Sequence, residues 1–237
     1  EWATKYMFHY RWHFKEDAEN AASLLPLNHN ASLPDEHWKQ FSEYIGPRQI
    51  ERLWVVGSNE TTAAVIEDSY KRFLEIMELH LANSPYLLGQ RPSSSDFAIF
   101  GQLTQLIGFD PTSRNIAHSI SKRTVAWINS MEDLSGLKTD DKDWIDVESI
   151  PKSLKDLFKE IGRVYVPALI ANAEAIKNED DTWETEIDGV LWSQKAFPYQ
   201  AKCLRWIREE FENLSEVDRV KVLEILDGSN CERLLEI

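Results

Sequence analysis

The sequence YLLGQRPSSSDFAIFGQ, residues 86–102, contains the signal for the start of a helix. Ser93 lies three residues before Asp96, which is the spacing of a capping box: the serine side chain accepts a backbone N–H of the first turn, and the carboxylate accepts the N–H of the serine. From Phe97 to Ile107 the chain carries no charged residue. A helix without a polar face is buried on all sides, so we expect this one to be the central helix of a bundle.

The Ser93–Asp96 pair is therefore interpreted as a structural capping box. A catalytic serine needs a base that activates its hydroxyl, and residues 86–102 contain no histidine. We predict no catalytic residue in this stretch.

Helical patterns extend on both sides of this signal. Residues 61–83 carry apolar side chains at helical spacing, from Ile66 through Tyr70 and Met77 to Leu81, with charged residues between them. We expect further helices at 2–24, 35–56, 115–132, 153–177, 199–213 and 216–227. Pro26 is expected to end the first, and the second should begin with Asp35 as N-cap and break at Gly46-Pro47. Pro167 should kink the helix at 153–177, and Gly228 follows the end of the last one. An acidic, irregular segment is expected at 133–151.

Residues 182–194 have a different pattern. Two alternating runs flank Asp188-Gly189, and this dipeptide is a strong signal for a β-hairpin with a two-residue turn. Such a turn pairs Ile187 with Val190 and Thr185 with Trp192. The sequence therefore predicts an all-α helical bundle of about seven to eight helices with one small β-hairpin, whose tryptophan face packs on the helices.

Composition limits the classes of partner. The net charge is −14, which argues against nucleic acids and anionic membranes because both bind positive surfaces. No apolar run is long enough to cross a bilayer, and we expect no signal peptide. We interpret Cys203 and Cys231 as reduced thiols and expect a cytoplasmic protein.

The residues around the capping box resemble the C-terminal helical domain of the glutathione S-transferase family. That family has a Leu-Gly pair, then Ser/Thr-x-Ala-Asp and an apolar helix; here Leu88-Gly89, Ser93 and Asp96 match, and Ser95 replaces the usual alanine. The resemblance covers residues 61–133, and the helix at 2–24 fits the family's first helix of this domain by order. The tail is similar to the extended C-terminal region of a bacterial transferase-like subgroup, in which residues 8–12 and 199–204 have counterparts.

This resemblance implies a division into a helical core, 1–134, and an extended helical region with the hairpin, 135–237, packed on the same domain. It also implies an upstream thioredoxin-like partner domain that binds glutathione and supplies the catalytic group. The helical domain then forms the wall for a small electrophilic second substrate and part of a homodimer interface. No βαβ pattern precedes residue 61, so we expect the glutathione-binding half to be absent and this chain alone to be inactive.

Four residues of the first helix are candidates for the substrate cleft, because the corresponding family helix faces it: His9, Tyr10, Arg11 and Trp12. An arginine among aromatic rings needs a carboxylate partner or an aromatic face to stack on. The alternative is thus a structural ion pair or a stacked arginine.

Two further patterns are compatible with ion-binding sites. His9 and His13 lie four residues apart, with Glu16 or Asp17 one turn on, a spacing that suits zinc; packed histidines are the simpler interpretation, and we predict no metal site. Lys202, Arg205 and Arg208 form a basic stripe, which is interpreted as a solvated or paired face, with an anion site as the alternative.

The sequence thus supports two main hypotheses for function. The first is the C-terminal domain of a glutathione S-transferase-like protein, which forms the second-substrate wall and an interdomain or dimer interface. The second is a non-enzymatic interaction or dimerisation module derived from the transferase fold. An independent metal-binding or small-anion-binding protein is a third, weaker alternative.

Overall fold

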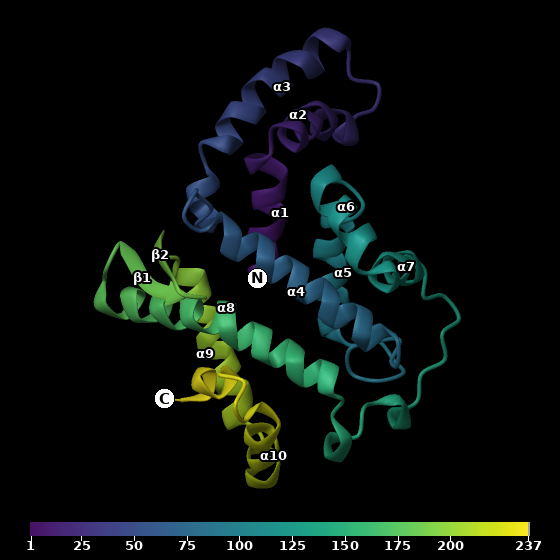
Figure 1. Cartoon of the computed structure of the whole chain (residues 1–237), viewed down its shortest axis with the longest axis vertical. Helices are drawn as coiled ribbons and strands as arrows, with labels where there is room; N and C mark the ends of the chain where they lie inside the picture. The colour runs from purple at the N-terminus through teal and green to yellow at the C-terminus, as the bar shows by residue number, and fades with distance from the viewer. Residues whose placement is uncertain (237) are drawn as a thin grey trace.

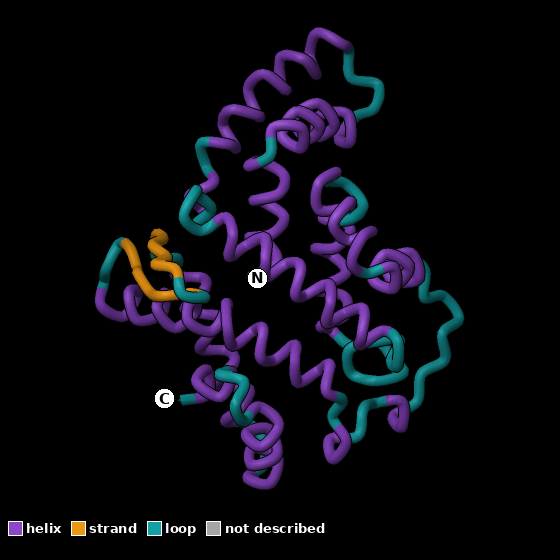
Figure 2. Tube along the Cα trace, viewed as in Figure 1, coloured by secondary structure: helices purple, strands orange, loops and turns teal. Residues whose placement is uncertain are grey.

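Two helices, α4 (Ala63–Leu81) and α8 (Lys152–Asn178), pack against each other through the middle of the molecule. Figure 1 shows the computed structural model, which describes residues 1–236. Within that range the chain forms ten α-helices, four short 3-10 helices and one two-stranded sheet (Figure 2). The prediction of an all-α fold with a small hairpin is confirmed.

Helix α4 buries the apolar stripe that the sequence predicts. Ile66, Tyr70 and Leu74 have no exposed surface, and Met77 is nearly fully buried. Ile66, Tyr70 and Leu74 pack in the main core with residues of α1 (Trp2–His13), α8 and the hairpin, whereas Met77 packs in a second cluster with Leu154 and Leu157 of α8. The 3.6-residue period of the sequence therefore identified a helix of the main core.

The first predicted helix is two helices. Helix α1 ends at His13, and α2 (Lys15–His29) begins after Phe14, whose backbone is extended with φ −88° and ψ 128°. Neither proline nor glycine marks this break in the sequence. Phe14 instead stacks on Tyr10, with ring centroids 5.6 Å apart, so tertiary packing of its ring accompanies the interruption.

Prolines end neither of the next two helices. Pro26 lies inside α2, and Pro47 lies inside α3 (Asp35–Ile50), which runs without the predicted break at Gly46. Both prolines lie close to the C-terminal end of their helices, so the helical bond that each removes is followed by less than one further turn. Pro34, not Asp35, occupies the N-cap position of α3. Figure 1 shows α2 and α3 as a helical hairpin that projects from the rest of the molecule.

Helix α5 (Ser94–Leu106) is not the central helix that its lack of charge predicts. Only Asp96, Leu103 and Leu106 of this helix are buried, whereas Phe97 is 51% exposed. Its inner side packs on α1, and the remaining side faces solvent. The absence of charge therefore marks an uncovered apolar face in this chain.

The predicted helix at 115–132 is also split in two. Helix α6 (Pro111–Ile120) and helix α7 (Lys122–Met131) meet at Ser121, whose side chain accepts the N–H of Thr124 and caps α7. Ser121 is fully buried. A serine that caps a following helix ends the preceding one, because the N-cap backbone is not helical.

The hairpin forms in the predicted register. Strands β1 (Thr182–Ile187) and β2 (Val190–Lys195) are antiparallel, and Ile187 pairs with Val190 and Thr185 with Trp192. Trp192 and Ile187 have no exposed surface, and β1 packs on α8. The prediction that the tryptophan face covers the helices is confirmed.

The chain closes with α9 (Pro198–Glu212), α10 (Glu216–Leu226) and a 3-10 turn, η4 (Cys231–Leu235). Ser215 caps α10 through the N–H of Asp218, and Gly228 follows with φ 68°. Helix α8 continues through Pro167 as one element. Three short 3-10 helices complete the chain: η1 (Leu53–Val56) before α4, and η2 (Asp141–Asp143) and η3 (Val147–Ser149) in the acidic segment.

Candidate functional site

The capping box at the start of α5 is the centre of a larger polar cluster. Asp96 accepts the N–H of Ser93 at 2.8 Å and its hydroxyl at 2.6 Å, and it also accepts the N–H of Leu87 at 2.9 Å. Asp96 has no exposed surface. The carboxylate therefore fixes the preceding loop and the helix start together, which is a structural task.

Gly89 shows why the Leu-Gly pair precedes this box. Its φ is 126°, and a Cβ there would lie 2.3 Å from the carbonyl oxygen of Asp143. Gln90 donates its N–H to that carbonyl at 2.7 Å, and Ile145 donates to Leu88 at 2.8 Å. Glycine thus lets the acidic segment pair with the loop before α5.

His9 is buried in α1 and lies between two polar groups. Its Nδ1 is 2.8 Å from Ser58 Oγ, and its Nε2 is 3.4 Å from Glu67 Oε1. Burial, with a smaller contribution from His13, lowers the pKa of His9 to about 3. His9 is therefore a neutral imidazole at physiological pH.

Tyr10 lies in the buried core, whereas Trp12 lines a cavity at the surface. Tyr10 has no exposed surface and packs 5.2 Å from the Tyr70 ring, and burial raises the pKa of its phenol far above the ordinary value. Trp12 is 3% exposed and lines a surface cavity of about 490 Å³ between α1, α2 and α3. Of the four residues proposed for the cleft, Trp12 is the one that lines such a cavity.

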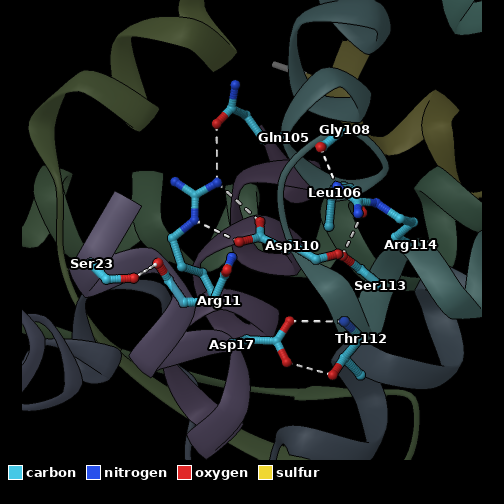
Figure 3. Close-up of polar contacts among 11 residues, drawn as sticks. Arg11, Asp17, Ser23, Gln105, Leu106, Gly108, Asp110, Thr112, Ser113 and Arg114 are labelled. Atoms are coloured by element: carbon cyan, nitrogen blue, oxygen red, sulfur yellow. Dashed lines mark hydrogen bonds and ion pairs between the residues drawn. The ribbon is translucent and has the colours of Figure 1, made fainter. Parts of the chain in front are cut away.

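Arg11 forms an ion pair, drawn in Figure 3, and it also stacks on an aromatic ring. Its Nε and Nη2 donate to the two carboxylate oxygens of Asp110 at 2.8 and 3.0 Å, and its guanidinium lies 4.4 Å from the Phe109 ring. Nη2 also donates to Gln105 at 3.0 Å. Burial raises the pKa of Asp110, and the pair with Arg11 opposes that rise. Both structural alternatives for Arg11 are therefore present together.

The Asp17 carboxylate, also drawn in Figure 3, connects α2 to the start of α6 through hydrogen bonds. Asp17, which has no exposed surface, accepts the Thr112 N–H at 2.9 Å and its hydroxyl at 2.5 Å. With the Arg11 pair, this contact positions the turn around Asp110. The figure shows these side chains meeting in a polar junction between α1, α2 and α6.

The residues of the two patterns that suit ion sites contact other residues of this chain. His9 and His13 stack with ring centroids 4.6 Å apart, and within residues 1–236 no three His, Cys, Asp or Glu side chains are grouped as metal ligands. Arg205 pairs with Glu209, and Arg208 donates to the Leu234 carbonyl. Both cysteines are free thiols.

The apolar cavity in the bundle was not predicted from the sequence. A volume of about 260 Å³, here called the α1–α5–α8 cavity, lies between these three helices. Its wall is almost entirely apolar, except for Glu1, Glu160, Tyr165 and Gln102, whose Oε1 is buried without a hydrogen-bond partner. The apolar wall comprises Trp2, Ala3, Tyr6, Phe73, Ile99, Leu103, Leu106, Leu157, Ile161 and Val164. Its lining residues come from α1, α5 and α8 and, through Phe73, from α4, so no local pattern identifies it.

Comparison with known proteins identifies one part of the chain. Residues 49–139 match the family described as "Glutathione S-transferase, C-terminal domain". This range contains α4 to α7 and the capping box, so the resemblance found in the sequence is confirmed for these residues. No curated protein and no solved structure matches the chain. No helix within residues 1–236 is long and apolar enough to cross a membrane.

Proposed function

We propose that this chain is the helical half of a glutathione S-transferase-like protein and that the α1–α5–α8 cavity is its second-substrate wall. The family match over residues 49–139 supports the transferase-like assignment. The presence of the cavity supports the proposed second-substrate wall. An apolar cavity with few polar groups is the usual character of a small-molecule site. Glutathione and the activating residue would come from an upstream thioredoxin-like domain.

The uncovered face of α5 is the proposed contact for that domain. Phe97, Ala98 and Gly101 are exposed, and no charged residue occurs between Asp96 and Asp110. An uncharged helix face that stays exposed is typical of an interface. Glu1 and Trp2 line the α1–α5–α8 cavity, so a domain joined ahead of α1 would lie close to the cavity as well. In this arrangement His9, Tyr10 and Arg11 hold α1 in place behind the wall.

The first test is the intact mass of the protein isolated from its native source. We expect a mass larger than that of this chain by a small domain, roughly 80 residues by the usual range of domain sizes. The longer form should bind glutathione. A native mass equal to that of this chain would overturn the two-domain proposal.

A second test addresses the cavity with a fluorescent apolar dye, anilinonaphthalene sulfonate. Ile99→Trp places a larger ring in the α1–α5–α8 cavity and should weaken dye binding several-fold. Val220→Trp on α10, where Val220 is 51% exposed, is the matched control and should leave binding unchanged. Equal dye affinities in the two variants would exclude this cavity as the apolar binding site.

The aromatic surface of α3 favours a second candidate function, a non-enzymatic dimerisation module. Phe41 is 43% exposed, Tyr44 61% and Trp54, just after α3, 52%. Sedimentation velocity of the wild type should then show a dimer that Tyr44→Glu converts to a monomer. Leu191→Glu, at an equally exposed position of the hairpin, should keep the dimer. A wild type that is monomeric at all concentrations would exclude this function.

A further inference from the structure

Lys5 is a buried lysine without an acidic partner. It lies in the first turns of α1, is 5% exposed, and its Nζ is 5.4 Å from the Trp2 ring and 5.2 Å from the Trp192 ring. None of the ion pairs formed within residues 1–236 includes Lys5. A buried ammonium is costly when no carboxylate compensates for its lost hydration.

The hydrogen bonds of Lys5 suit a neutral amine. Nζ donates to the Val56 carbonyl at 3.1 Å and to Gln194 Oε1 at 2.8 Å. A neutral amine has two N–H donors and one lone pair, so these two acceptors satisfy both donors and leave the lone pair unused. Gln194 is held in turn by its own donation to the Val55 carbonyl at 2.7 Å. Burial lowers the pKa of Lys5 to about 7, and the charge of Glu1 opposes this shift.

The amine borders a cavity that a small molecule can occupy. This cavity, here called the Lys5 cavity, has a volume of about 310 Å³ and lies between α1, η1, β2 and the start of α9. Val55, Val56 and Phe197 line it with apolar groups, and Tyr199, which is 65% exposed, lines it toward solvent. Glu1 is the acidic group in the wall, so an anionic ligand is disfavoured. The chemistry of the wall favours an uncharged, apolar electrophile.

We propose that Lys5 is a nucleophile that captures small apolar aldehydes in the Lys5 cavity as imines. The Nζ lone pair attacks the carbonyl carbon, a C–N bond forms, and the C=O π pair moves to oxygen. A proton passes from nitrogen to that oxygen to give a carbinolamine, which loses water to give the C=N bond. No oxidant or reductant takes part. Desolvated lysines in apolar pockets are the ones that form such adducts.

Gln194 is a positioning residue in this proposal. Its Oε1 accepts from both Lys5 Nζ and Trp192 Nε1, the latter at 3.1 Å. The hairpin thereby holds the amine beside the cavity. Among the residues that line the cavity, the titratable groups besides Lys5 are Glu1 and Tyr199; η1 and β2 contribute none.

The test is labelling of the intact chain with propanal and cyanoborohydride, followed by peptide mass mapping. At pH 7 an ordinary lysine is less than about 0.1% neutral, so Lys5 should be alkylated at least roughly ten times faster than Lys15, whose side chain is 88% exposed. The rate at Lys5 should level off above about pH 8, whereas the rate at Lys15 should keep rising to about pH 10. Circular dichroism checks that the chain stays folded.

A variant at the opening of the cavity separates capture in the cavity from general reactivity. Gln200→Trp should slow labelling of Lys5 several-fold and leave Lys15 unchanged, since Gln200 lines the Lys5 cavity and is only partly buried. Labelling of Lys5 at the rate of Lys15 across this pH range, or equal labelling of Lys5 in wild type and Gln200→Trp, would overturn the proposal. Neither result depends on glutathione, so the proposed transferase role is tested separately.

Discussion

His9 links the stability of the molecule to pH. The fold lowers its pKa to about 3, whereas an unfolded chain binds the proton near pH 6.5. Between these values the unfolded state holds more protons than the folded one, so stability falls as pH drops from about 6.5 to about 3. His9→Gln should reduce this slope in urea denaturation series between pH 7 and pH 4. An unchanged slope would contradict the burial of a neutral His9.

The ion pair of Arg11 and Asp110 gives a second prediction at the level of single residues. Arg11→Met should lower the free energy of unfolding by about 3–5 kcal/mol, because it leaves the carboxylate of Asp110 buried and uncompensated. Adding Asp110→Leu should restore much of that loss. The exposed pair Arg205–Glu209 is the control, and Arg205→Met should cost about 0–1 kcal/mol in the same urea titration. A cost for Arg11→Met equal to the control would contradict the buried pair.

Sequence reasoning could state what Arg11 needs but not which residue supplies it. A cation among aromatic rings requires a carboxylate or a ring face, and the structure provides both. Asp110 and Phe109 lie about a hundred positions further along the chain, however. Only the packing of α1 on the α5–α6 turn brings them together, and no local pattern encodes that contact.

Gly57 decides how closely the hairpin approaches α1 and η1. Its φ is 72°, and a Cβ there would lie 2.5 Å from Trp192 Nε1. Gly136 has a similar φ of 78° with no atom near its missing Cβ, so it is the matched control. In thermal or urea unfolding, Gly57→Ala should cost about 1–3 kcal/mol more than Gly136→Ala, because the methyl group displaces the ring. Equal losses would mean that the hairpin is free to shift.

At the level of elements, the sequence was informative where the signals are local. The turn at Asp188-Gly189 fixes the hairpin register, and the period of residues 61–83 identifies α4. The breaks at Phe14 and Ser121 could not be located, because one accompanies the stacking of a ring on Tyr10 and the other depends on a buried cap. The predicted central position of α5 was wrong, because a lack of charged residues shows that a helix surface is apolar but not that other helices of this chain cover it.

For the whole molecule we predict one cooperative unfolding transition. The regions 1–134 and 135–237, proposed to pack as a single domain, share the contact of α4 with α8. Arg72 strengthens it: its guanidinium donates to both carboxylate oxygens of Glu160 at 2.8 Å and lies 3.2 Å from the Asp188 carboxylate. Tryptophan fluorescence and far-ultraviolet circular dichroism should therefore give coincident urea transitions. Two separated midpoints would show two independent units.

The acidic segment has a practical consequence for handling this molecule. Residues 135–142 are all exposed, and the segment is tied back where Arg91 contacts Asp140 and Asp141 and where Gln90 and Ile145 make their backbone bonds. Helix α4 before this segment and helix α8 after it pack against each other, and Ile145 and Ile150 of the segment add to the cluster that contains Met77 and Leu154. A chain severed after Gly136 should thus give two complementary fragments that reassemble when mixed. One fragment can then carry isotopic labels while the other stays silent, which makes each half of the bundle separately visible by nuclear magnetic resonance.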